Sequence, residues 1–168
     1  MADDGNAAVS AAIGDLADPD PARRAAAAER LCQAGERARS ASVDLVRACG
    51  DADESVREWA VAALEAIGPP PPTLVPGLAE LATARSQLVA YWAITLLGRS
   101  GKDAATVLET LTQCVASTDL AVAQRAAWAL GRIGPAAAAA VSALRDAASR
   151  GDERLTRLAT ESIAAIGA

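Results

Sequence analysis

The sequence predicts an all-α protein made of five successive pairs of helices. Glycine recurs every 33 residues, at Gly35, Gly68, Gly101, Gly134 and Gly167. Alanine supplies 45 of the 168 residues and Phe is absent, so large core side chains are scarce. Alanine is the best helix former, and small side chains let helices approach toward the short end of the roughly 8–10 Å interaxial range. We therefore expect thin layers of closely packed helices.

The second helix of each pair has the more regular pattern. Counting back from the repeated glycine, positions −12, −8, −4 and −1 are mostly apolar and share one helical face. Position −15 holds Asp or Ser, which are favoured N-cap residues, and the glycine is expected to end the helix in the left-handed conformation. The predicted second helices cover 20–34, 53–67, 86–100, 119–133 and 152–166.

The first helix of each pair precedes a short polar turn and carries an apolar residue at position −23. The run Pro69–Pro72 does not interrupt the 33-residue register, so we expect a single domain over 1–168. Pro76 is expected to kink or delay the third of these helices. The predicted first helices cover 7–16, 39–49, 73–83, 104–116 and 136–149.

Two repeats carry a recognisable motif. Residues 53–68 read Asp-Glu-Ser-Val-Arg-Glu-Trp-Ala-Val-Ala-Ala-Leu-Glu-Ala-Ile-Gly, and 119–134 end in Ala-Leu-Gly-Arg-Ile-Gly. These residues resemble the HEAT-repeat family, and in particular the bacterial repeats similar to those of phycobilisome lyases. The resemblance implies a right-handed α-α superhelix, or solenoid. It also implies a scaffold or adaptor that binds partners along an inner, concave surface lined by the second helices.

The sequence departs from this family at the position after the motif Val. Arg24 and Arg57 occupy it in the first two repeats, but Ala90, Ala123 and Thr156 follow. In the family this arginine can pair with an aspartate of the neighbouring repeat. We therefore expect any Asp–Arg ladder to weaken after the second repeat.

The charge balance limits the classes of partner. The net charge is −5 and the pI is near 4.8, which argues against general binding to nucleic acid or anionic membranes. A HEAT-like DNA-binding protein is therefore a less favoured reading. Cys32, Cys49 and Cys114 are far apart, as in a reducing compartment. The N-terminus lacks a signal-peptide pattern, and no stretch approaches about 20 apolar residues, so we expect a cytoplasmic protein without a membrane span.

The sequence offers no catalytic, metal or cofactor site. Histidine is absent, which removes Ser–His and Cys–His nucleophile activation and histidine-based metal sites. The acidic cluster of Asp51, Asp53 and Glu54 is better explained by turn and cap chemistry. We expect no enzyme, but a protein–protein interaction module that acts as an adaptor or as a subunit of a larger complex. The alternative, implied by the resemblance, is an accessory enzyme or chaperone of the bilin-lyase type.

The candidate partner-binding residues lie at positions −10, −6 and −2 of the second helix in the third repeat and in the fourth repeat. Trp, Tyr and Arg are enriched in binding hot spots. Trp128 has an alternative role as a spacer packed on the neighbouring repeat, while Trp59 and Trp92 are expected to border the core. Exposed ends of the array are a possible surface for self-association. The predicted site for a protein or peptide comprises Tyr91, Thr95, Arg99, Gln124, Trp128 and Arg132.

Overall fold

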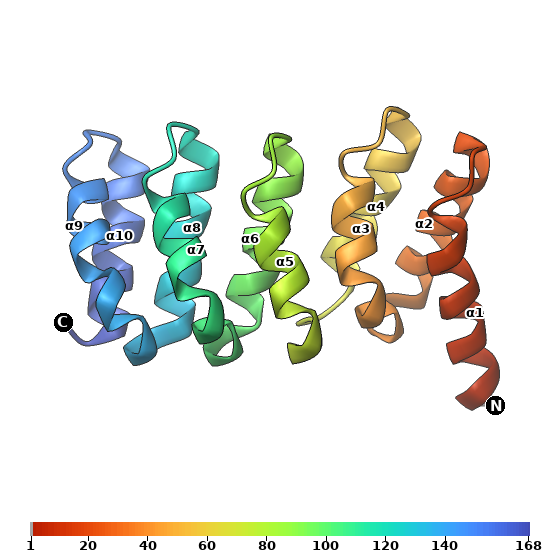
Figure 1. Cartoon of the computed structure of the whole chain (residues 1–168), viewed down its shortest axis with the longest axis horizontal. Coiled ribbons are helices and arrows are strands. Elements are labelled where there is room, and N and C mark those ends of the chain that lie inside the picture. The colour runs from red at the N-terminus through yellow and green to blue at the C-terminus, as the bar shows by residue number, and fades with distance from the viewer. Residues whose placement is uncertain (1) are drawn as a thin grey trace. The chain divides into compact units, whose positions relative to one another are not determined.

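The protein is a succession of helical hairpins, as the sequence predicts (Figure 1). The computed structural model describes residues 2–168, and every regular element in that range is a helix. Each hairpin pairs an odd-numbered helix with the even-numbered helix that follows it. The α-helices are α1 (Ala2–Asp15), α2 (Pro21–Ala34), α3 (Ser42–Ala48), α4 (Glu54–Ala66), α5 (Val75–Leu81), α6 (Gln87–Arg99), α7 (Leu108–Val115), α8 (Leu120–Ile133), α9 (Val141–Ala148) and α10 (Glu153–Ile166).

The chain divides into two compact units, Met1–Leu74 and Val75–Ala168. The division follows the proline run 69–72, whose residues have no backbone N–H for a helix. The first unit holds α1 to α4, and the second holds α5 to α10. A single domain over 1–168 remains a prediction.

In the first unit, α2 packs along α4, while α1 packs on α2 and α3 on α4. Leu31, Leu45 and Leu64 are almost fully buried between them. In the second unit, α8 packs between α6 and α10, and each of these helices also packs on its own hairpin partner. Leu97, Leu130 and other large side chains of this unit are fully buried between its first and second helices. The further members are Leu78, Leu111, Leu144 and Leu155.

The second helices match their predicted bounds within a residue or two, but most first helices differ from prediction. Their first turns are 3-10 helices: η1 (Gly35–Ala41), η3 (Gly101–Val107) and η4 (Gly134–Ala140) lead into α3, α7 and α9. Such turns are common at helix termini. The short η2 (Pro72–Leu74) precedes α5, so Pro76 lies in the first turn of α5 and the predicted delay is confirmed.

The ends of the second helices show which cap predictions were correct. Asp20, Asp53, Asp119 and Asp152 accept hydrogen bonds from backbone N–H groups of the first helical turn, whereas Ser86 does not. These caps satisfy N–H groups that the helix leaves without a partner.

The predicted left-handed glycine conformation is found at Gly167, and Gly101 also has a positive φ, of 55°. Gly35 and Gly134 also have positive φ, but their ψ values are −132° and −145°, a region that is essentially restricted to glycine. Gly68 has no positive φ, because α4 ends at Ile67 in an extended conformation before the prolines. The repeated glycine therefore serves more than one kind of turn.

Cysteines behave as small apolar residues in the structure. Cys49 and Cys114 are buried, and Cys32 is half-buried. Burial raises the pKa of the Cys49 thiol to about 12 and also raises that of Cys114.

One stretch departs from the prediction that none is apolar enough to span a membrane. Residues Leu120–Ala148 are long and apolar enough to cross a membrane by length and composition, with a mean hydropathy of 1.2. In the structure they are not one straight helix, because Gly134 has a φ of 74° and Ala137 is non-helical. The stretch supplies α8, η4 and α9, whose apolar residues contribute to the core of the second unit.

A charged pair joins the first two repeats. Arg24 Nε lies 2.7 Å from Asp51 Oδ2, and Arg24 Nη2 lies 2.8 Å from Asp51 Oδ1. This bidentate geometry is the strong form of an Arg–carboxylate contact. The hydrogen bond from Arg24 is the main cause that lowers the pKa of Asp51, and the backbone N–H of Asp53 adds to it. The expected Asp–Arg ladder thus has one rung in this unit.

Asp51→Asn should destabilise the protein near neutral pH and lose this effect in acid. The folded state lowers the pKa of Asp51 below its unfolded value of about 4. Its ionised form therefore contributes stability above pH of about 4, and this contribution disappears as the pH falls through the folded pKa. Urea unfolding at neutral and acidic pH measures the difference between wild type and variant. Asp44→Asn is the control, because Asp44 forms only an exposed pair with Arg47. A difference that stays constant with pH would contradict the role of the carboxylate.

Candidate interaction site

The six predicted site residues lie on α6 and α8 of the second unit, but they do not form one exposed patch. Tyr91, Gln124 and Trp128 are half-buried and lie close together around one cavity. Arg132 is exposed and does not line that cavity, and neither does Arg99. The structure therefore brings together half of the predicted set.

Thr95 is a correction to the predicted site. Its side chain is only 5% exposed, and its Oγ1 donates a hydrogen bond to the Tyr91 carbonyl at 2.8 Å. Every residue of α6 from Trp92 to Gly98 is buried. The helix face that was expected to be exposed to solvent is therefore covered over this range. Thr95 is a core residue rather than a contact for a partner.

The tryptophans of position −9 also differ from each other. Trp92 is buried, as predicted for a residue at the border of the core, and its ring meets Tyr91 edge-on at 5.9 Å. Arg99 lies over the Trp92 ring, 5.7 Å from its centroid. Trp59 is 37% exposed, so the predicted packing role is wrong there.

Arg125 is the residue around which the aromatic side chains gather. Its guanidinium carbon lies 4.5 Å from the Tyr91 ring centroid and 5.1 Å from that of Trp128. Its Nη2 also donates a hydrogen bond to Tyr91 Oη. A guanidinium over an aromatic face is attracted by the negative charge of that face. Arg125 thereby contacts one aromatic residue of α6 and one of α8.

Trp128 packs on the backbone of α6. A Cβ atom added to Gly98 would lie 2.8 Å from Cε3 of the Trp128 indole and closer still to Cζ3. The absence of a side chain at Gly98 therefore allows the indole to approach the neighbouring repeat. This geometry supports the spacer role of Trp128, although the side chain remains partly accessible.

The cavity beside this group has a volume of about 220 Å³. Gln124 lines this cavity and contacts the next repeat, because Gln124 Nε2 donates a hydrogen bond to Asp152 Oδ1 at 2.9 Å. Two hydrogen bonds lower the pKa of Asp152: the larger cause is the one from the Leu155 N–H, and the second is the one from the Gln124 side chain. We name this cavity the aromatic–arginine pocket, and its lining residues are Tyr91, Ala121, Gln124, Arg125, Trp128, Arg154 and Leu158.

Sequence reasoning missed Arg125, Arg154 and Leu158. Arg125 occupies position −9, where the two preceding repeats have Trp59 and Trp92, and this position had been assigned to the edge of the core. The signal was a charged residue in a column whose other members, Ala26, Trp59, Trp92 and Leu158, are all apolar. Arg154 and Leu158 belong to α10, and only packing against α8 brings them to the pocket.

The pocket is lined by two guanidinium groups and two aromatic rings, which are groups that can contact acidic or aromatic side chains. Among residues 5–168, no group of three or more His, Cys, Asp or Glu side chains is placed to hold a metal ion.

Comparison with known families agrees with this architecture. A profile of HEAT repeats matches residues 10–84 and 75–164. The chain belongs to the HEAT-repeat family. No curated protein matches it.

Several solved structures share the fold of this HEAT-repeat protein. A designed armadillo repeat protein in complex with the peptide (KR)4 is 18% identical, with a TM-score of 0.68, and the match covers 94% of this chain and 81% of that one. The complex of CpcE and CpcF of phycocyanin lyase from Nostoc is 20% identical, with a TM-score of 0.62, covering 93% and 98%. An engineered protein is 22% identical, with a TM-score of 0.65, covering 95% and 79%. At these identities the similarity shows the fold.

Gly98→Ala should destabilise this HEAT-repeat protein because its methyl group would collide with Trp128. Overpacking costs about 1–3 kcal/mol, which exceeds the gain in helix propensity of about 1 kcal/mol. In a Trp128→Ala background the collision is absent, and the same substitution should become stabilising. Urea unfolding of the four proteins measures this reversal.

Gly14→Ala is the matched control, since nothing lies within 4 Å of a Cβ added to this helical glycine. It should leave stability unchanged or raise it. The assignment of Trp128 as a packing residue is wrong if Gly98→Ala has the same effect with and without the indole.

Proposed function

We propose that this HEAT-repeat protein is a non-catalytic interaction module that binds a partner protein or peptide on the face lined by its second helices. In repeat arrays that face is usually concave and serves recognition. The protein would act as an adaptor or as a subunit of a larger complex. The observation that carries the proposal is the aromatic–arginine pocket, where Arg125, Trp128 and Tyr91 are held in a fixed, partly accessible arrangement.

The chemistry of the pocket favours a particular partner. Arg154 lies at its edge and Arg125 lies within it, although the whole protein carries a net charge of −5. A local positive site on an acidic protein favours a segment with an acidic side chain, and the ring faces favour an adjacent apolar or aromatic residue. Fixed side chains also reduce the entropy cost of binding.

The neighbours in fold support a protein partner in general terms. One of them is in complex with a peptide, and another is a complex of two proteins, CpcE and CpcF. The half-buried and buried free cysteines and the acidic composition support the further proposal of a cytoplasmic location.

A second candidate function is that of an accessory protein of the bilin-lyase type. The structural match covers 98% of the matched chain of the CpcE–CpcF complex. This role would require the protein to handle a chromophore. An absorbance spectrum of the protein purified from its natural cells distinguishes the two functions, because an interaction module without a chromophore absorbs only in the ultraviolet.

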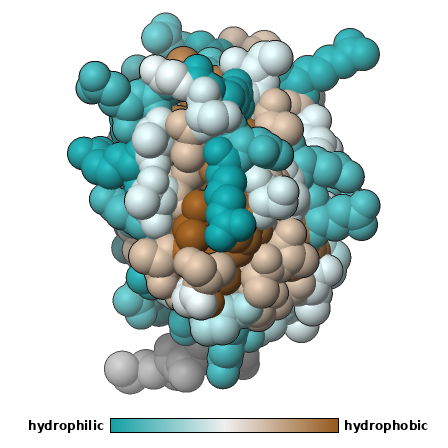
Figure 2. All heavy atoms as spheres, turned by 90° about the vertical axis from the view of Figure 1, so that its left-hand side faces the viewer, coloured by the Kyte–Doolittle hydropathy of each residue, from teal (hydrophilic) through white to brown (hydrophobic). Residues whose placement is uncertain are grey.

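Self-association is a third arrangement. Figure 2 shows the end of the second unit, where hydrophobic residues gather over α9 and α10 among hydrophilic ones. Half-buried Leu158 and Ile163 belong to α10. Light scattering at increasing concentration detects a dimer formed through this end.

Arg154→Glu should weaken binding of the partner without unfolding the protein. Arg154 is exposed in the first turn of α10, where an acidic residue is favourable to the helix. Reversal of the charge should exclude an acidic segment and cost about 2 kcal/mol, or roughly 30-fold in affinity. Affinity purification from native cells identifies the partner, and calorimetry measures the affinity.

Arg145→Glu is the control, because Arg145 is exposed on α9 and does not line the pocket. Equal affinity of wild type and Arg154→Glu, with helicity unchanged, would place the partner elsewhere. Trp128→Ala is a second variant, whose loss of binding is interpreted together with its unfolding curve.

A further inference from the structure

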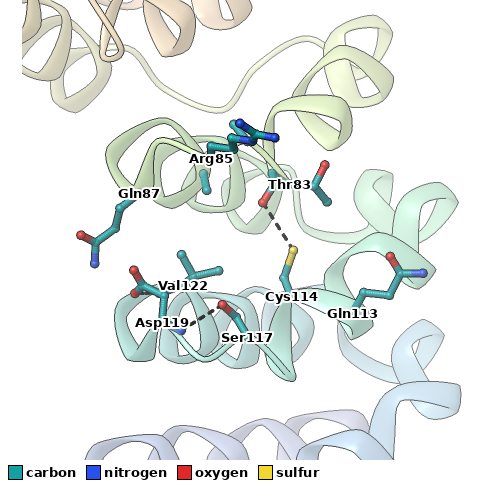
Figure 3. A pocket seen from close by; sticks show the side chains of 11 residues that line it. Thr83, Arg85, Gln87, Gln113, Cys114, Ser117, Asp119 and Val122 are labelled. Carbon is teal, nitrogen blue, oxygen red and sulfur yellow. Dashed lines mark hydrogen bonds between the residues drawn. The ribbon is translucent and has the colours of Figure 1, made fainter.

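A second cavity lies between the α5–α6 turn and the α7–α8 turn. It lies on the side of α8 that packs on α6, whereas α10 packs on the other side of α8. Its volume is about 330 Å³, within the range of small-ligand pockets. The turn residues Ala84 and Arg85 form one wall, and Cys114 and Ser117 of the next repeat face them (Figure 3). We name it the turn pocket, and it is also lined by Ala82, Thr83, Gln87, Ala90, Gln113, Asp119 and Val122.

The equivalent turns of three other repeats, the first, second and fourth, hold a guanidinium group from the chain itself. In the first repeat, Arg24 Nη1 donates to the carbonyls of Asp18 and Pro19 at 2.9 and 3.1 Å. In the second repeat, Arg57 Nη1 donates to the carbonyls of Asp51 and Ala52, at 2.8 and 2.9 Å. The same two turn positions, −17 and −16, supply the acceptors in both repeats.

The fourth repeat obtains its guanidinium from a different position. Arg150, at the turn of the fifth repeat, donates from Nη2 to the Ser117 carbonyl at 2.8 Å and from Nη1 to the Val115 carbonyl at 3.2 Å. The carbonyl at position −17 thus accepts from a guanidinium in three repeats, although the arginine comes from two different columns. The turn geometry, rather than one conserved arginine position, defines this acceptor site.

The third repeat differs from these. Its carbonyls at the two turn positions belong to Ala84 and Arg85, and among residues 5–168 no side chain donates a hydrogen bond to either. Position −11, which supplies Arg24 and Arg57 elsewhere, is Ala90 here. In the fourth repeat, Ser117 occupies the position that Asp51 has in the second repeat. The turn pocket lies where the first unit has the Arg24–Asp51 pair.

Ser117 keeps the local role of Asp51 without its charge. Asp51 Oδ1 accepts from the Asp53 N–H at 2.9 Å, and Ser117 Oγ accepts from the Asp119 N–H at 3.1 Å. The turn therefore keeps the same side-chain-to-backbone hydrogen bond, while the turn pocket has Ala90 and Ser117 in place of the Arg24–Asp51 pair.

The lining of the turn pocket carries one carboxylate, and the Arg150 guanidinium lies on the carbonyl of its lining residue Ser117. Asp119 contributes a carboxylate, and its column in the second repeat, Asp53, acts favourably on the Arg24 guanidinium. Arg85 is the positive residue of the lining, but Figure 3 shows its side chain on the far side of the turn from Cys114 and Ser117. Ala82, Ala90 and Val122 provide apolar walls for an alkyl stem.

We propose that the turn pocket binds the guanidinium group of an arginine side chain that a partner polypeptide presents. The Ala84 and Arg85 carbonyls would accept its N–H groups as the carbonyls of the sister turns do, and the Asp119 carboxylate would supply the charge. The planar fork of a guanidinium can reach two neighbouring acceptors at once, which an ammonium group does less well. This site is separate from the aromatic–arginine pocket and does not depend on the function proposed for it.

The test titrates N-acetylarginine amide, a peptide-like probe, into the full-length protein labelled with ¹⁵N. The amide signals of Ala84, Ser117 and Asp119 should shift in a saturable manner. N-acetyllysine amide should bind several-fold more weakly. Absence of a saturable shift with the arginine probe overturns the proposal. Saturable binding of agmatine without binding of the blocked arginine overturns the polypeptide source of the guanidinium.

Two variants make the test specific to the turn pocket. Ser117→Asp restores the carboxylate of the first unit and should tighten binding of the arginine probe about tenfold, as a charged hydrogen bond would. Ser142→Asp adds the same charge at an exposed position in the first turn of α9 and should leave the affinity unchanged. Equal effects of the two substitutions would show a general charge effect and contradict the site.

Ala90→Arg supplies the chain with its own guanidinium at the position of Arg24. It should abolish binding of the probe, and the fold of the variant is checked by its NMR spectrum. Unchanged probe affinity in folded Ala90→Arg would overturn the proposal. If this variant does not fold, the comparison of Ser117→Asp with Ser142→Asp decides the question.

Discussion

The close approach of neighbouring second helices within each unit is the constraint on which the rest of the structure depends. Position −8 holds alanine in all five repeats, and every one of these side chains is fully buried. A methyl group at this place lets one helix lie near the next, so leucines at −4 can reach across the contact. With few large side chains available, stability depends on many such small contacts rather than on one thick core. The alanines are Ala27, Ala60, Ala93, Ala126 and Ala159.

This packing leaves the turns and the outward positions of the second helices free to differ. The same turn holds a guanidinium from Arg24, Arg57 or Arg150 in three repeats, yet it opens into a cavity in the third. Near the other end of α6, Gly98 lets the Trp128 indole approach the helix, and Arg125 lies over the Trp128 ring. Both candidate sites therefore arise where single residues depart from the repeat pattern, while the helices that carry them keep the common spacing.

The repeat pattern was sufficient to predict the second helices, their aspartate caps and nearly all of their buried faces. On the apolar face, Arg23 is exposed in the first repeat, and Ala34, Ser100 and Ile163 are only half-buried. Sequence reasoning failed where neighbours rather than the helix itself decide exposure. Thr95 was expected to face solvent, but adjacent packing buries it, and Arg125 was assigned to the core edge although it organises the pocket. The 3-10 turns before α3, α7 and α9 were also missed, because the repeated pattern marks the apolar positions and not the type of helical turn.

Replacement of Ala126 by leucine tests the central constraint most directly. Leucine is almost as good a helix former as alanine, so any loss of stability reports the space between α8 and its neighbours. Ala165→Leu, at an exposed position of α10, is the reference. Urea unfolding should show that Ala126→Leu lowers the free energy of unfolding by about 1–3 kcal/mol, with little change for Ala165→Leu. Equal stability of Ala126→Leu and wild type would contradict the requirement for a small side chain at this contact.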